Sequence, residues 1–282
     1  MSSQLLERSA LRIEPLGGAV GARIQGVDLD DIGPVHATEL RQALHEHGVL
    51  FLRPGADAQV TAEQFLRLAE CIGDIMVFPY GDKIPKEDPR IGYIDSENAI
   101  QQDREYCWHC DGTPEERPPG AALLNSVILP SSGGDTMWAS MYAAYDSLSS
   151  KYQRFLDGLE ALHTTDCMAR KMAPGVGEQI FGKGSHCVHP VVLTDPLTGR
   201  RMLYVNENYT DRIVGLSNKE SESVLKMLFN HVSSTPELQL RWQWQANDIA
   251  IWEQRVTQHR AVPNWQGKRV LRRITINGDR PA

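Results

Sequence analysis

The amino-acid sequence predicts a mainly β protein with flanking helices, built as a barrel or a double-sheet jelly roll. Helix signals are clear in two segments before residue 73 and in one after residue 217. The chain after residue 120 otherwise consists mostly of short apolar or alternating segments separated by turn residues. The length of 282 residues suits one large domain, so we expect a single domain over residues 1–282.

The predicted helices have recognisable ends. The first covers residues 39–47 and lies between Thr38 and Gly48. The second begins at a capping box at residues 61–64, where glutamine follows threonine three positions later, and stops at Gly73. A similar capping box at residues 217–220 begins the third helix, whose apolar residues recur at helical spacing.

The predicted strands are short and bounded by turns. A fully apolar run at residues 49–52 predicts a buried strand, and strict alternation at residues 238–244 predicts a half-buried one. Residues 172–185 contain four glycines and one proline, which predicts a loop, and we expect the wider segment 165–186 to act as a lid. Further strands are expected at residues 121–129, 188–193, 202–205, 249–252 and 270–277, with a hairpin turn at 194–199.

Composition argues against several classes of protein. The formal net charge of −7 disfavours a nucleic-acid-binding surface. The sequence has no signal-peptide pattern and no apolar run of the roughly 18 residues that a membrane span needs. Five unevenly spaced cysteines disfavour a disulfide framework. We therefore expect a cytoplasmic protein without nucleic-acid or membrane partners, and a homo-oligomer is compatible with the sequence.

A candidate metal site lies in the segment Trp108-His109-Cys110-Asp111. In a strand, His109 and Asp111 would point to the same face. One imidazole and one carboxylate are two of the three ligands in the facial triad of non-haem Fe(II) oxygenases, and the third would be a histidine far along the chain. Taken alone this pattern is weak, because an exposed turn can carry the same residues.

The surrounding segments are more specific. WHCDGT at 108–113, GGDTMW at 133–138, WEQRVTQHRAV at 252–262 and KRVLRRITINGD at 268–279 resemble motifs of the taurine dioxygenase family, which includes taurine and 2,4-dichlorophenoxyacetate dioxygenases. The resemblance spans almost the whole chain, with the motifs in family order. It implies a double-stranded β-helix fold, Fe(II) bound by His109, Asp111 and His259, and an oxygenase that consumes 2-oxoglutarate and O₂ and releases succinate and CO₂.

The last predicted strand carries two arginines on one face. Arg269 and Arg273 would lie about 13 Å apart along the strand, at different depths of one pocket. A buried arginine needs an anionic partner, and its planar guanidinium suits a carboxylate. By the resemblance, Arg269 and the Thr136 hydroxyl hold the distal carboxylate of 2-oxoglutarate, and Arg273 lies nearer the prime substrate. The alternative is a solvated run of charges, which fits Arg272 on the opposite face.

The expected substrate is a small organic anion. An Arg273 without a carboxylate side chain beside it would be compensated by a carboxylate, sulfonate or sulfate head group. By the resemblance, a taurine enzyme has a histidine shortly after the second helix, whereas Phe78 stands there in this chain. An apolar Phe78 in the substrate wall favours a carboxylate with an apolar body over taurine.

Two functions without oxygenase turnover remain open from the sequence alone. Structural zinc is one of them, with Cys107, Cys110, Cys187 and His189 as the candidate ligands. Nucleotide binding is the other, because residues 177–184 resemble a phosphate-binding loop, although glycine stands at 184 where serine or threonine would hold Mg²⁺.

Overall fold

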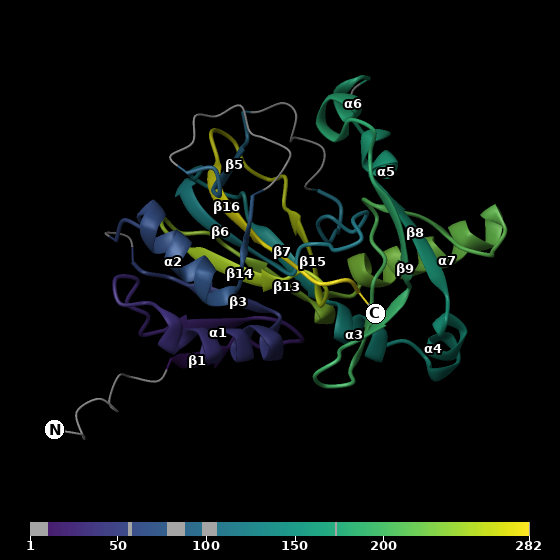
Figure 1. The fold of residues 1–282 in the computed structure, drawn as a ribbon, viewed down its shortest axis with the longest axis horizontal. Coiled ribbons are helices and arrows are strands. Elements are labelled where there is room, and N and C mark those ends of the chain that lie inside the picture. Colours follow the sequence, from purple (N-terminus) through teal and green to yellow (C-terminus); the bar gives the residue numbers. More distant parts are fainter. Residues whose placement is uncertain (1–10, 56–57, 78–87, 98–105, 173, 282) are drawn as a thin grey trace.

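The computed structural model describes residues 11–55, 58–77, 88–97, 106–172 and 174–281. These residues form a mainly β structure with flanking helices, as predicted (Figure 1). In spatial order, the largest sheet contains β1 (Arg12–Pro15), β2 (Ala22–Gln25), β3 (Val49–Leu52), β14 (Ile249–Glu253), β6 (Ala121–Ile128), β16 (Val270–Ile276) and β4 (Ile75–Met76), and β5 (Gly92–Asp95) also pairs with β16.

The remaining strands form three smaller sheets. Two of these have three strands each and the third is a hairpin, and the described strands close no barrel. The sheets are β13 (Gln239–Trp242), β7 (Thr136–Ser140) and β15 (Thr257–Ala261); β12 (Thr210–Ile213), β8 (Glu160–Thr164) and β9 (His186–Pro190); and β10 (Val192–Thr194) with β11 (Arg201–Leu203).

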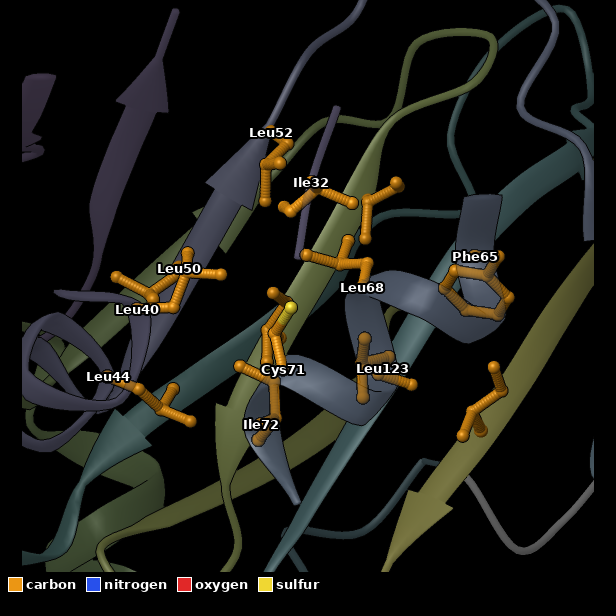
Figure 2. Packing of buried hydrophobic residues seen from close by; sticks show 14 of the residues in the cluster. Ile32, Leu40, Leu44, Leu50, Leu52, Phe65, Leu68, Cys71, Ile72 and Leu123 are labelled. Carbon is orange, nitrogen blue, oxygen red and sulfur yellow. The ribbon is translucent and has the colours of Figure 1, made fainter. Parts of the chain in front are cut away.

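Two helices cover one face of the main sheet, α1 (Pro34–His47) and α2 (Ala62–Ile72). Leu50 of β3 and Leu123 of β6 pack against Leu40 of α1 and Leu68 of α2 in one buried cluster (Figure 2). The alternate residue Phe51 belongs to a second cluster on the opposite face of the sheet. Because β3 is buried on both faces, its sequence is an unbroken apolar run.

The second cluster lies where the main sheet faces the sheet of β13, β7 and β15. Phe51 stacks on Trp242 with ring centroids 4.1 Å apart and meets the edge of Trp138 at 5.3 Å. Leu271 of β16 also belongs to this cluster. Side chains alternate along a strand, so Arg273 lies on the same, inner face as Leu271. Arg269 directly precedes β16 and reaches the same side, because its Nη2 contacts Thr136 of β7. The site described below lies between these two sheets.

A further group of helices and strands lies beyond β7 and β15 (Figure 1). Its third buried cluster joins residues from α3, α7 and the β10–β11 hairpin. None of the described helices has both the length and the apolar character needed to cross a membrane. The remaining helices are α3 (Met141–Asp146), α4 (Ser150–Leu156), α5 (Thr165–Ala169), α6 (Val176–Phe181), α7 (Asn218–Ser234) and the 3₁₀ helix η1 (Pro236–Leu238).

The local signals of the sequence are largely confirmed. Both capping boxes form, at Thr61 and at Ser217. The hairpin turn at 194–199 is confirmed by the pairing of β10 with β11. The prediction of a loop over 172–185 is partly wrong, because α6 lies within it, and α5 lies within the wider segment 165–186. The single domain and the lid function of that segment stay predictions.

Candidate metal centre

Backbone pairing brings together two distant parts of the candidate site. His109 lies outside the named strands and forms an isolated antiparallel bridge with His259 of β15. Its N–H donates to the His259 carbonyl at 3.0 Å, and the His259 N–H donates back at 2.8 Å. The prediction that residues 109–111 form a strand is therefore wrong, since His109 forms only an isolated bridge and a turn begins two residues later at Asp111.

The predicted triad nevertheless converges. Each of His109, Asp111 and His259 is at least 93% buried, and the three offer ligand atoms that all lie within 4.8 Å of one another. His109 Nε2 is 3.7 Å from Asp111 Oδ1, and His259 Nε2 is 3.5 Å from Asp111 Oδ2. Two imidazoles and one carboxylate fit the donor set of non-haem Fe(II) and leave other coordination positions for co-substrates.

Hydrogen bonds orient the ligands. His109 Nδ1 lies 2.8 Å from the carbonyl oxygen of Cys107, so Nδ1 carries the proton and Nε2 is free to bind a metal. Gln254 Nε2 donates to Asp111 Oδ2 at 2.7 Å. Sequence reasoning missed Gln254, because no spacing signal marks a glutamine in a turn as a partner of a residue so far along the chain.

The electrostatic environment favours the protonation states of the triad that a cation requires. Burial alone raises the pKa of Asp111, but Arg273, His259, His109 and the hydrogen bond from Gln254 outweigh it and hold that pKa below its usual range. Burial, followed by the neighbouring His109, lowers the pKa of His259 to about 3. An ionised carboxylate beside a neutral imidazole is the protonation state that a metal requires.

Arg269 and Thr136 meet in a second, adjoining part of the site. Arg269 is 2% exposed, and its Nε donates to the Gly134 carbonyl at 2.9 Å while Nη2 lies 3.3 Å from Thr136 Oγ1. A Cβ at Gly134 would lie 3.0 Å from Arg269 Cδ, so glycine permits this close approach. Trp244 also donates from Nε1 to Thr136 Oγ1 at 3.0 Å.

Two sequence interpretations of arginines need correction. Arg272 is not a solvated charge, because it is 9% exposed and its Nη2 donates to Asn125 Oδ1 at 2.6 Å and to the Val60 carbonyl at 2.5 Å. Arg273 has a carboxylate partner after all, since its Nη2 lies 2.9 Å from Asp111 Oδ2. The argument that only a ligand anion could compensate Arg273 is therefore wrong, although the residue does lie beside the triad. Phe78 lies outside the described residues.

The zinc and nucleotide interpretations receive no support from the geometry. The group of His, Cys, Asp or Glu side chains that converges within the described residues contains no cysteine. Cys110 instead donates from Sγ to the Gln254 carbonyl at 2.9 Å. Residues 177–184 contain most of α6, which begins one residue earlier at Val176, so no strand leads into a phosphate-binding turn there.

Comparison with known proteins agrees with this geometry. The family model described as "Taurine catabolism dioxygenase TauD, TfdA family" matches residues 12–275. An alpha-ketoglutarate-dependent sulfate ester dioxygenase from Pseudomonas putida is 32% identical, with 96% of this chain and 91% of the relative covered. An alkylsulfatase from Acinetobacter baylyi is 31% identical, with 95% of this chain and 86% of the relative covered.

A crystal structure of a taurine dioxygenase from Burkholderia xenovorans superposes with a TM-score of 0.80 at 30% identity, covering 97% of this chain and 93% of that one. The match of the family model extends over nearly the whole chain, well beyond the motifs around the triad. The chain therefore belongs to the TauD/TfdA family, and it is a non-haem iron dioxygenase that depends on 2-oxoglutarate.

Proposed function

We propose that this dioxygenase binds Fe(II) through His109, Asp111 and His259 and hydroxylates a small organic anion. The observation that carries the assignment is the convergence of three buried ligand atoms within 4.8 Å. Bound iron, 2-oxoglutarate and O₂ supply the oxidising chemistry, with succinate and CO₂ as the co-products. The chain would be a single domain with the double-stranded β-helix fold, and the face-to-face packing of two sheets agrees with that fold.

The distal carboxylate of 2-oxoglutarate would bind at Arg269 and Thr136. The Thr136 oxygen already faces donors from Arg269 and Trp244, at 3.3 and 3.0 Å. A hydroxyl oxygen has two lone pairs, so its own hydrogen is the group left to point at a ligand. The hydroxyl would then donate to the carboxylate, and the buried Arg269 would supply the compensating charge.

The substrate's head group would lie at Arg273, on the inner face of β16 and beside the triad. The names of two relatives, a sulfate ester dioxygenase and an alkylsulfatase, favour a sulfate ester as the head group. A carboxylate with an apolar body, expected from Phe78, stays a prediction. All of these head groups are oxyanions that a guanidinium can bind through two N–H groups.

A panel of matched substrates tests the proposal. The assay would compare the succinate produced with alkyl sulfates, sulfonates and carboxylates of equal chain length. The methyl ester of the carboxylate would be included. Arg273→Gln should abolish the substrate-dependent part of succinate formation but preserve the visible absorption band of the Fe(II)–2-oxoglutarate complex. Equal turnover of the acid and its ester would refute the anionic head group, and wild-type succinate formation by Asp111→Ala would refute the triad.

A further inference from the structure

Gln254 holds the segment that carries two of the triad's residues. It follows β14 directly and is fully buried. Its side-chain Oε1 accepts a hydrogen bond from the Asp111 N–H at 3.2 Å, and its Nε2 donates to Asp111 Oδ2 at 2.7 Å. Its main-chain carbonyl accepts from Cys110 Sγ at 2.9 Å. One residue thus contacts both the backbone and the carboxylate of Asp111.

The orientation of this carboxamide is determined by its partners. A backbone N–H can bond only to the amide oxygen, and an ionised carboxylate can accept only from the amide nitrogen. The reverse orientation would break both hydrogen bonds. Gln254 itself is anchored by its own N–H, which donates to the Gly120 carbonyl at 2.9 Å.

The two oxygens of Asp111 therefore have different surroundings. Oδ2 accepts from Gln254 and forms the ion pair with Arg273 at 2.9 Å. Within the part of the chain that the structure describes, Oδ1 receives no hydrogen bond, and it faces His109 Nε2 at 3.7 Å. Oδ2 also lies 3.5 Å from His259 Nε2, but it already accepts the hydrogen bond from Gln254 and faces the charge of Arg273. Oδ1 therefore has the lone pairs that remain available to a cation.

We infer that Gln254 is a positioning residue of the metal centre, which holds the Asp111 carboxylate so that Oδ1 binds the metal and Oδ2 faces Arg273. This inference rests on the proposed triad. Gln254 acts through Asp111 and does not touch the metal itself. Because a hydrogen-bonded partner of a metal ligand fixes the ligand's orientation before binding, its loss weakens metal affinity about 10- to 100-fold.

Gln254→Met tests the inference, because methionine keeps the volume and removes both hydrogen bonds. The measurement is the dissociation constant of Mn(II) for the full chain, by anaerobic calorimetry, with the thermal unfolding midpoint recorded alongside. The matched control is Gln258→Met. Gln258 precedes His259, but its side chain lies on the opposite face of β15, where it is 3% exposed and donates at 2.7 Å to the Val205 carbonyl. We expect both variants to lose stability and only Gln254→Met to lose Mn(II) affinity, by about 10- to 100-fold.

The outcomes separate this inference from the proposed function. Asp111→Ala that binds Mn(II) like the wild type would overturn the metal site itself. Loss of binding in Asp111→Ala, with Gln254→Met within threefold of the wild type, would overturn only the positioning role. An equal loss of Mn(II) affinity in Gln258→Met would show that the effect comes from general destabilisation of the fold, and would also overturn the positioning role. If Gln254→Met does not fold, Gln254→Ala, which admits water to the Asp111 N–H, carries the same expectation.

Discussion

Arg269→Ala should weaken binding of 2-oxoglutarate more than any other change outside the triad. Arg269 is 2% exposed, and its contacts with Gly134 and Thr136 hold the guanidinium in place before a ligand arrives. Removing one partner of a buried, charge-assisted pair costs about 2–5 kcal/mol. At about 1.4 kcal/mol per tenfold change, we expect the dissociation constant to rise by about 10² or more.

Anaerobic titration of the Fe(II)-loaded protein with 2-oxoglutarate, followed at the visible charge-transfer band, measures this constant. Arg269→Lys should recover part of the affinity, because lysine keeps the charge but loses the planar fork. Arg272→Lys is the matched control, since Arg272 is also buried but contacts Asn125 on the other face of β16. If Arg269→Ala left the affinity for 2-oxoglutarate unchanged and Arg273→Ala reduced it strongly, Arg273 would be the residue that binds 2-oxoglutarate and Arg269 the one nearer the substrate.

Two further predictions concern residues that the sequence did not single out. Trp244→Phe should raise the 2-oxoglutarate dissociation constant about 2- to 10-fold in the same titration, because one hydrogen bond to Thr136 contributes about 0.5–1.5 kcal/mol; an unchanged constant would contradict the role given to Trp244. Burial, followed by the charge of His189, lowers the pKa of His163 from 6.5 to about 3, so only the unfolded chain binds this proton between those values and the protein loses stability as the pH falls through them. In denaturant unfolding between pH 7 and 5, His163→Gln should reduce the loss of unfolding free energy by up to about 1.4 kcal/mol per pH unit. The exposed His186→Gln is the control and should leave that loss unchanged. An unchanged loss in His163→Gln, or an equal reduction in His186→Gln, would refute the assignment of the effect to His163.

The sequence correctly predicted the structural elements that depend on residues close together in the chain. The capping boxes at Thr61 and Ser217 need only residues three positions apart, and both form. The apolar run 49–52 predicted a strand buried on both faces, and β3 is one. The pairing of β10 with β11 followed from the turn residues between them. In each case the chain within a few residues contains all the information that the element requires.

The failures involve partners that are distant in the sequence. Charge alone suggested that Arg272 is solvated, yet Asn125 and the Val60 carbonyl satisfy its guanidinium beneath α2. His109 and Asp111 were expected on one strand, but the bridge to His259 ends at a turn. The three predicted side chains converge in spite of this, because the resemblance specified them without depending on the local backbone, and their role as metal ligands stays a prediction.

The bridge between His109 and His259 also affects the order in which the protein can fold. The two residues lie in distant parts of the chain, and their paired N–H and carbonyl groups join the segment before the turn to β15. Closing a long loop costs entropy before any contact offsets it, so this pairing should form late. A nascent chain that still lacks β15 therefore lacks His259, one of the three proposed ligands. A metal that bound only the docked state would add to the free energy of unfolding, so newly made chains would become less open to proteolysis once the proposed ion is bound.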